Sequence, residues 1–213
     1  MVVLVTGAAG FIGSHVVERL LLQGHQVRGT ARDIESASFL KEFPVGKGSS
    51  LELVKMDLLD ARSVDAAVAG CTEVIHCAAV LMVGINEVQS DLIDPSVQGT
   101  MNVCKAIEKS GTVRTIVHTS SVAAIRSSFY TNGHVFTADD WCEDASAQIN
   151  PYGFAKAEGE RVVRRFVEAM NEEVRPRLMT IHPSLVFGPI HHKRHLNGSM
   201  AYMKHFKGKL PFV

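Results

Sequence analysis

The chain begins with an apolar, β-branched run, Val2–Thr6, which breaks directly into three glycines spaced three residues apart. The run is typical of a buried strand, and Gly7 permits a tight turn after it. Gly10 leaves room for the backbone to approach a pyrophosphate, and Gly13 lets the next helix pack close to the strand. A glycine triplet also occurs in plain strand-to-helix connections, so the motif alone is weak evidence. In this context it predicts a dinucleotide-binding turn.

Short β-branched runs alternate with helical hydrophobic patterns along the chain. The expected strands are Val2–Thr6, His25–Thr30, Leu51–Met56, Glu73–Cys77, Val113–Thr119 and Leu178–His182. The expected helices are Phe11–Gln23, Ser36–Glu42, Ala61–Ala69, Pro95 to about Lys109, and Pro151–Asn171. Steady alternation favours parallel pairing with right-handed crossovers. We therefore predict the α/β class with a doubly wound, Rossmann-type parallel sheet, in which ligands lie at the carboxyl ends of the strands.

Composition excludes several classes of partner. Lysine plus arginine number 22, as do aspartate plus glutamate, so no net charge favours nucleic acid or an acidic membrane surface. No apolar run is long enough to span a bilayer. The glycine turn begins at residue 7, which leaves no room for a signal peptide, and the four cysteines form no CxxC pair. We expect a cytoplasmic protein with reduced thiols.

Three motifs carry a resemblance to a known family: TGAAGFIG at 6–13, Tyr152-x-x-x-Lys156, and HPSLVFGP at 182–189. Together they resemble the extended short-chain dehydrogenase/reductase family, which includes NAD-dependent epimerases and dehydratases. Three further segments look most like its dihydroflavonol, cinnamoyl-CoA and aldehyde/ketone reductase branch: VRGTARD at 27–33, DPSVQGT at 94–100 and HTSS at 118–121.

The resemblance implies a domain organisation. It covers Met1 to about Pro189, so residues 1–189 are expected to form an NAD(P)-binding Rossmann domain. Members of the family continue well beyond this length into a smaller substrate-binding lobe. Residues 190–213 are therefore expected to be the beginning of a truncated lobe.

The candidate catalytic residues are Ser121, Tyr152 and Lys156. Tyr152 and Lys156 are four residues apart in an expected helix and so share one face. An ammonium beside the phenol, with an oxidised nicotinamide, is expected to lower the phenol pKa from about 10 towards neutrality. The resemblance implies that Tyr152 donates a proton to a carbonyl oxygen, that Lys156 holds the nicotinamide ribose, and that Ser121 polarises the oxygen. Read without context, these residues would be a surface Tyr–Lys pair and a strand-ending serine.

The resemblance also implies a set of cofactor-binding residues. Asp57 is expected to accept a hydrogen bond from the adenine, and Ala78 and Ala79 to leave space for the pyrophosphate and ribose. The backbone after the sixth strand is expected to lie against the nicotinamide carboxamide. The full set is Gly7, Gly10, Phe11, Ile12, Gly13, Arg32, Asp57, Leu58, Ala78, Ala79, Ser120, Tyr152, Lys156, Pro183, Ser184 and Val186.

The end of the second expected strand indicates which cofactor is used. A carboxylate there would accept from the ribose 2′-hydroxyl of NADH and repel a 2′-phosphate. The residues present are Gly29, Thr30, Ala31 and Arg32, which are neutral and then basic, and a guanidinium suits a phosphate. We expect NADP, with NADPH preferred over NADH, although Asp33 is adjacent and no second basic residue follows closely.

His191, His192 and His195 raise the question of a metal site. Their immediate neighbours are Lys193 and Arg194, with no carboxylate or cysteine nearby in sequence. A solvated loop is the expected structure, and no metal site is predicted.

These observations predict an NADPH-dependent reductase of an aldehyde or ketone, acting by hydride transfer with a tyrosine as proton donor. The expected partner is a small-molecule carbonyl substrate, and the expected state is a monomer or homodimer without nucleic acid or membrane. One alternative is an NAD-dependent nucleotide-sugar epimerase or dehydratase, or a 3β-hydroxysteroid dehydrogenase-like enzyme. Another is a catalytically silent dinucleotide-binding module, which the short C-terminal part of the chain favours.

Overall fold

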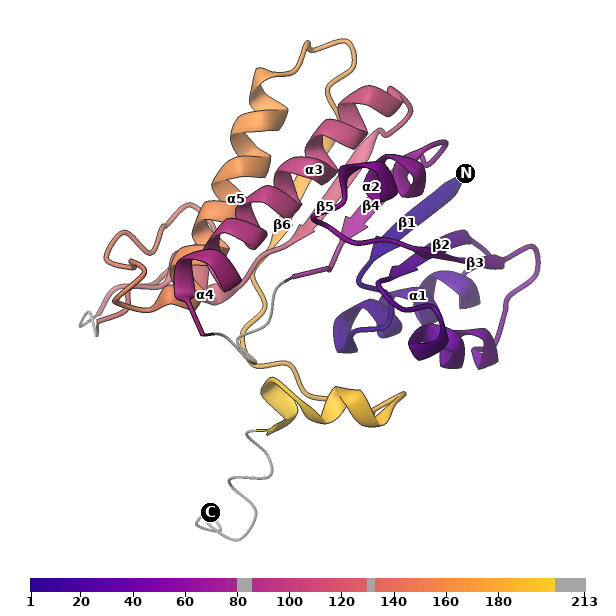
Figure 1. Cartoon of the computed structure of the whole chain (residues 1–213), viewed down its shortest axis with the longest axis horizontal. Coiled ribbons are helices and arrows are strands. Elements are labelled where there is room, and N and C mark those ends of the chain that lie inside the picture. The colour runs from indigo at the N-terminus through magenta and orange to yellow at the C-terminus, as the bar shows by residue number, and fades with distance from the viewer. Residues whose placement is uncertain (80–85, 130–132, 202–213) are drawn as a thin grey trace, which may run out of the picture.

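The computed structural model describes residues 1–79, 86–129 and 133–201. Within these ranges six strands form one sheet in the order β3-β2-β1-β4-β5-β6, and every neighbouring pair is parallel (Figure 1). The strands are β1 Val2–Thr6, β2 Gln26–Ala31, β3 Ser50–Lys55, β4 Glu73–His76, β5 Thr115–Thr119 and β6 Arg177–Ile181. The predicted doubly wound α/β fold is confirmed.

Helices cover both faces of the sheet (Figure 1). The α-helices are α1 Phe11–Leu22, α2 Ala61–Val68, α3 Asp94–Ser110, α4 Val122–Ile125 and α5 Pro151–Ala169. Shorter elements are the 3-10 helices η1 Glu35–Glu42 and η3 Lys193–Leu196 and the π-helical turn η2 Gln89–Ile93. None of the helices in the described ranges is both long and apolar enough to cross a membrane.

The central strand divides the interior into two cores. Leu4 and Val5 are both fully buried, and they face opposite sides because successive side chains of a strand alternate. Leu4 packs in the core formed with α2, α3 and α5, whereas Val5 packs in the core formed with α1 and η1. Such two-sided burial is the reason that the strand is an unbroken apolar run.

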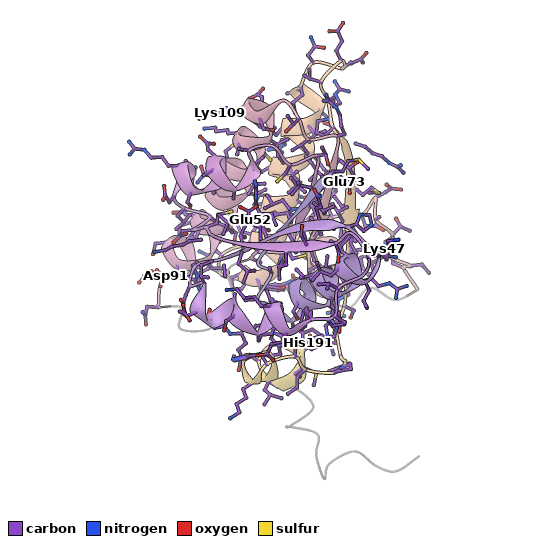
Figure 2. All side chains as sticks on the ribbon, turned by 90° about the vertical axis from the view of Figure 1, so that its right-hand side faces the viewer. Lys47, Glu52, Glu73, Asp91, Lys109 and His191 are labelled. Carbon is purple, nitrogen blue, oxygen red and sulfur yellow. The ribbon has the colours of Figure 1, made fainter. Side chains whose placement is uncertain are left out.

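The segment after β6 differs from the expectation of a solvated loop. His195 is only 3% exposed, and its Nε2 lies 3.1 Å from the backbone oxygen of Ala9. The ring of His191 stands edge-on to that of Phe43, with 4.6 Å between centroids. Figure 2 shows His191 where this segment meets the helical layer of α1 and η1. The expectation is wrong because the aromatic and backbone partners of these histidines come from the first quarter of the chain. The boundary expected after residue 189 stays a prediction.

Candidate active site

The glycine turn joins β1 to α1 at the carboxyl edge of the sheet. Gly7 has a φ of +65°, and a Cβ there would lie 2.8 Å from the Cα of Ala78. A Cβ on Gly13 would lie 2.2 Å from the backbone oxygen of Gly7. Close backbone packing therefore requires glycine at both positions, because neither leaves room for a side chain.

The N-terminal turn of α1 opens on the same edge. Gly10 is the N-cap and offers no side chain, and its carbonyl accepts the first helical bond from Ser14 at 2.9 Å. The N–H groups of Phe11, Ile12 and Gly13 precede that bond, so the helix itself provides no acceptor for them. Free N–H groups and the helix dipole make this turn suited to an anion such as a pyrophosphate.

A cavity of about 30 Å³ lies at the carboxyl ends of β4 and β5, between these strands and α3 and α5. Such a volume holds one or two water molecules. Several predicted site residues line it: Leu58, Ala78, Ala79, Tyr152 and Lys156. The structure thus brings the tyrosine–lysine pair to the strand ends, together with part of the predicted cofactor set.

The start of α5 fixes the position of the tyrosine. Asn150 adopts a left-handed conformation with φ of 53°, and its side chain accepts a hydrogen bond from the N–H of Gly153 at 3.0 Å. A Cβ on Gly153 would lie 2.7 Å from the backbone oxygen of Ala123, so α5 packs directly on α4. Tyr152 follows this cap, and the Nζ of Lys156 lies 5.9 Å from its ring centroid. The two side chains share one face, as predicted from their spacing.

Burial dominates the electrostatics of the pair. It raises the pKa of the Tyr152 phenol, and a hydrogen bond with the Ser121 hydroxyl partly offsets this. It also lowers the pKa of Lys156 to about 8. The protein alone therefore shifts the phenol pKa in the direction opposite to the expectation, and holds the phenol in its protonated form.

The two serines after β5 have different surroundings. Ser121 is the N-cap of α4, and its Oγ accepts a hydrogen bond from the N–H of Ala123 at 3.1 Å. Ser120 is 3% exposed, and its Oγ makes no hydrogen bond within the described part of the chain, although its proximity helps to lower the pKa of the buried Glu160. Ser121 is thus the serine beside the phenol, whereas Ser120 faces a buried carboxylate.

A pair of buried histidines under the cavity was not anticipated. His76 and His118 are paired in register on β4 and β5, with ring centroids 5.4 Å apart, and both line the cavity. His76 Nδ1 is hydrogen-bonded to the hydroxyl of Thr6 at 2.7 Å. Burial, together with the charge of Lys156, lowers the pKa of His76 to about 4, so this ring is neutral. The sequence carries one sign of this pair, because each of two apolar strands has a histidine near its end.

A buried ion-pair network holds α5 against β6. Glu160 is fully buried, and its carboxylate accepts from His182 Nε2 at 2.8 Å and from Arg164 Nε at 2.8 Å. Arg164 also donates to Thr180 on β6 at 2.8 Å. Tyr152, Lys156, Glu160 and Arg164 are four residues apart in succession, so this stripe was readable from the sequence. The network positions the helix that carries the tyrosine.

Asp57 and Leu58 lie in the turn after β3. The Oδ1 of Asp57 accepts from the N–H of Leu59 at 3.0 Å, so its carboxylate shapes the turn. The carbonyl of Leu58 accepts from Asn102 Nδ2 at 2.7 Å. A Cβ on Gly99 would lie 3.0 Å from the Cβ of Leu58, which explains a glycine at this point of α3.

Arg32 follows β2 directly and is exposed. The neighbouring Asp33 accepts from the N–H of Glu35 at 3.1 Å, so this carboxylate is engaged in the turn that begins η1. β2 lies three strand spacings from β5 in the sheet order, roughly 14 Å. Only an elongated ligand could therefore reach both Arg32 and Tyr152.

The residues predicted after β6 reach the same edge. The carbonyl of Pro183 accepts from the N–H of Val122 at 3.0 Å, which joins this segment to the start of α4. Ser184 is exposed, and Val186 donates its N–H to the hydroxyl of Ser199 at 3.1 Å. The backbone after β6 is thus held beside Ser121.

Comparison with known sequences identifies relatives of the same kind. Residues 3–208 match the model of the NAD dependent epimerase/dehydratase family. Tetraketide alpha-pyrone reductase 2 of Arabidopsis thaliana is 37% identical over 195 residues, which are 88% of this chain and 59% of that protein. Cinnamoyl-CoA reductase CAD2 of Medicago truncatula is 34% identical over 199 residues, 89% of this chain and 59% of that protein. The chain thus spans about three fifths of the length of these relatives.

Solved structures show the same architecture. The yeast methylglyoxal/isovaleraldehyde reductase Gre2 complexed with NADPH superposes with a TM-score of 0.87 at 29% identity, covering 100% of this chain and 69% of that one. Gre2 of Candida albicans in complex with NADPH gives 0.78 at 33% identity, covering 89% and 59%. The similarity includes the sheet and the strand ends at which the candidate site lies.

Proposed function

The chain belongs to the NAD dependent epimerase/dehydratase family, as its motifs predicted, and on that premise we propose that it acts as an NADPH-dependent reductase of an aldehyde or ketone. The predicted resemblance to the dihydroflavonol and cinnamoyl-CoA reductase branch is confirmed by the relatives, which include a dihydroflavonol 4-reductase of Hordeum vulgare. Cytoplasmic location and oligomeric state stay predictions.

One observation carries the proposal. Tyr152 and Lys156 are adjacent side chains that line a cavity at the carboxyl ends of the strands, and Ser121 lies beside the phenol. A phenol, an ammonium and a hydroxyl at one point can protonate a carbonyl oxygen and stabilise the charge that develops on it. The glycine turn and the free N–H groups of α1 fit a pyrophosphate at the same edge.

Proton transfer is the task that we assign to Tyr152. Because burial raises its pKa, the phenol keeps its proton at neutral pH and can donate it to the oxygen of a carbonyl substrate. Bound NADPH would supply the hydride for the carbonyl carbon. Ser121 would donate a hydrogen bond to the same oxygen, and the ammonium of Lys156 would stabilise the phenolate that remains and hold the nicotinamide ribose.

The other predicted residues would bind along the cofactor. We assign Arg32 to the 2′-phosphate, because a guanidinium offers a planar pair of donors and the adjacent Asp33 is engaged in its own turn. Asp57 and Leu58 would lie at the adenine, Ala78 and Ala79 at the pyrophosphate and ribose. The segment containing Pro183, Ser184 and Val186 would lie at the nicotinamide carboxamide. The Gre2 complexes with NADPH support this choice of cofactor.

A second candidate keeps the fold and changes the chemistry. MoeE5 in complex with UDP-glucose and NAD has a TM-score of 0.62 at 27% identity, which favours a nucleotide-sugar epimerase or dehydratase. Arg32 at the end of β2 argues against it, since NAD-using members would place a carboxylate there. Preference for NADPH over NADH separates the two functions.

The test is Tyr152→Phe, which removes only the phenolic oxygen. We expect NADPH oxidation with a panel of small aldehydes, diketones and aryl ketones to fall by about 10²-fold or more, the range of general acid catalysis. NADPH affinity, measured by titration calorimetry, should be nearly unchanged, which serves as the internal control for folding. Equal turnover by both proteins would contradict the assignment of Tyr152.

A further inference from the structure

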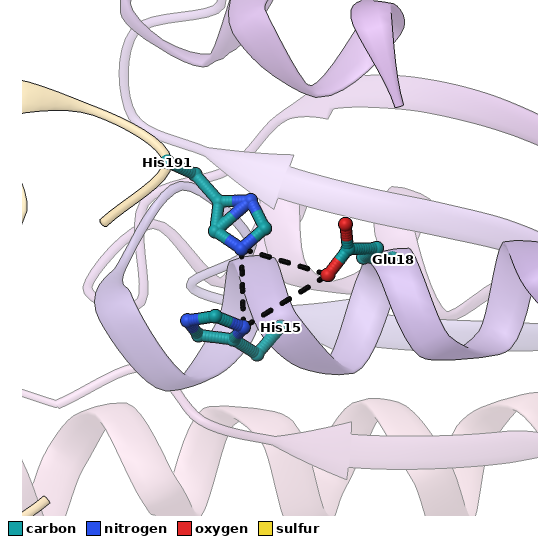
Figure 3. Close-up of side chains that lie close together, drawn as sticks. All are labelled: His15, Glu18 and His191. Atoms are coloured by element: carbon teal, nitrogen blue, oxygen red, sulfur yellow. Dashed lines mark hydrogen bonds and ion pairs between the residues drawn. The ribbon is translucent and has the colours of Figure 1, made fainter. Parts of the chain in front are cut away.

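Two histidines and a glutamate converge outside the proposed catalytic site. His15 and Glu18 lie one turn apart on α1, and His191 comes from the segment after β6 that packs against this helix (Figure 3). His191 Nε2 is 3.1 Å from His15 Nδ1 and 3.6 Å from Glu18 Oε2, and His15 Nδ1 is 3.9 Å from the same oxygen. Each residue therefore directs one ligand atom towards a common point.

The size of this triangle matches a metal ion. A point equidistant from its three corners lies about 2.1 Å from each atom. Zinc binds imidazole nitrogen at about 2.0–2.1 Å and carboxylate oxygen at about 2.0–2.2 Å. The two nitrogens are within hydrogen-bond distance of each other, whereas the two separations that involve Glu18 are too long for hydrogen bonds. They are close to the spacing of two ligand atoms on one metal ion.

The ring of His15 has the orientation of a metal ligand. Its Nε2 lies 3.0 Å from the carbonyl oxygen of Pro189, which can only accept a hydrogen bond. The ring proton is therefore on Nε2, and the lone pair of Nδ1 points at Glu18 and His191. A backbone carbonyl that fixes the tautomer of a ligating histidine is a common outer partner in metal sites.

Aromatic rings close one side of the site. The rings of Phe11 and Phe43 stand edge-on to the two histidines, with 5.1 and 4.6 Å between centroids, and provide an apolar wall.

We propose that His15, Glu18 and His191 form a site for a divalent transition-metal cation, with Zn²⁺ as the preferred ion and its remaining position open to water. Two imidazole nitrogens and one carboxylate oxygen suit zinc, whereas calcium and magnesium prefer all-oxygen sites. No carboxylate lies near these histidines in the sequence, whereas the fold brings Glu18 of α1 to within 3.6 Å of His191.

The proposed site would connect two segments that are far apart in the sequence. Its ligands come from α1 and from the stretch after β6, which is also anchored by hydrogen bonds from His195 to the carbonyl of Ala9 and from Arg194 to Ser36. A bound ion would therefore hold this stretch against α1. The proposal rests on geometry away from Tyr152, so it stands or fails independently of the reductase assignment.

The test is metal binding by the whole chain, prepared without a histidine tag and treated with EDTA. Titration calorimetry with ZnCl₂ and the visible absorption of Co²⁺ should both report one ion per chain. His15→Ala and His191→Ala should each weaken binding at least tenfold, and Glu18→Gln should weaken it less.

His192→Ala removes an exposed histidine of the same segment and should bind like the parent protein. His134→Ala removes an exposed histidine that pairs with Asp140, and should do the same.

Melting temperatures in EDTA check that the variants fold. Zn²⁺ should raise the melting temperature of the parent and of the two control variants, and should leave that of His15→Ala unchanged. An absence of Zn²⁺ binding at millimolar concentration, or equal binding by all the variants, would overturn the proposal. Glu18 is about one third exposed, so Glu18→Gln remains informative if a histidine variant fails to fold.

Discussion

The same two residue types, histidine and glutamate, meet in two regions of this molecule in different ways. On α5, Glu160 is fully buried and its carboxylate lies 2.8 Å from both His182 and Arg164. On α1, Glu18 is 32% exposed and its carboxylate lies 3.6 Å or more from both histidines. The first cluster is complete as hydrogen bonds, whereas in the second the two histidines are within hydrogen-bond distance of each other but not of the carboxylate. Interatomic distance, rather than residue type, is therefore the basis for treating the first cluster as structural and for proposing that the second binds an ion.

Removal of the buried carboxylate should have the largest effect. Glu160→Ala leaves the half-exposed Arg164 and the buried His182 without their partner, and loss of one member of a buried pair costs about 3–5 kcal/mol. We expect a fall of that size in the free energy of unfolding, measured with urea at pH 7. Glu18→Gln is the matched variant on α1 and should change stability by less than about 0.5 kcal/mol without metal. Similar losses of unfolding free energy in Glu160→Ala and Glu18→Gln would show that the two clusters do not differ in this way.

The buried histidines under the cavity should give a smaller, pH-dependent effect. The folded pKa of His76 is lowered to about 4, whereas an unfolded histidine titrates near 6.5. Above pH 6.5 the ring is neutral in both states. Between about pH 6.5 and pH 4 only the unfolded chain binds the proton. The free energy of unfolding therefore decreases as the pH is lowered through this range. One group of this kind removes about 2 kcal/mol between pH 7 and 5.

The control for this effect is His76→Gln, which cannot titrate. Its unfolding free energy should vary less over pH 7 to 5 than that of the parent, with His118 accounting for part of the remaining slope because its pKa is lowered as well. Glu160 contributes below this window: its folded pKa is lowered, so its stabilisation is lost as the pH falls further. An unchanged slope in His76→Gln would show that folding does not lower the pKa of this ring.

Local patterns predicted the six strands and the long helices, because hydrophobic period and helical spacing act over a few residues, whereas the short elements η2, α4 and η3 were not predicted. The strands were predicted to within two residues, and Tyr152 and Lys156 share a face as expected. Glu160 was also readable, as the next member of the same four-residue stripe. The pairing of His76 with His118 depends on strand register, which no local pattern contains.

Long-range packing accounts for the remaining differences. His191 and His195 are covered by rings from α1, from η1 and from Phe43 just after it, and by backbone of the glycine turn, which no neighbour in sequence reveals. Burial of Tyr152 raises the phenol pKa, and the expectation drawn from the neighbouring lysine and an oxidised nicotinamide did not include this loss of solvent. Both differences arise from contacts between segments that are distant in the chain.

The smallest predicted effect concerns the exposed cation at the end of β2. Arg32→Ala should weaken NADPH binding about tenfold or more, because a charge-assisted hydrogen bond contributes about 1.5–3 kcal/mol. NADH affinity should change by less than about threefold, since NADH lacks the 2′-phosphate that Arg32 would contact.

Titration calorimetry of both cofactors measures the two losses. The control is Arg194→Ala, which removes another exposed arginine on the α1 side that donates to Ser36. Equal losses for the two cofactors would assign Arg32 to the adenine face instead of the phosphate. That outcome would restore the NAD-using alternative, because Arg32 would then no longer favour the 2′-phosphate that distinguishes NADPH from NADH.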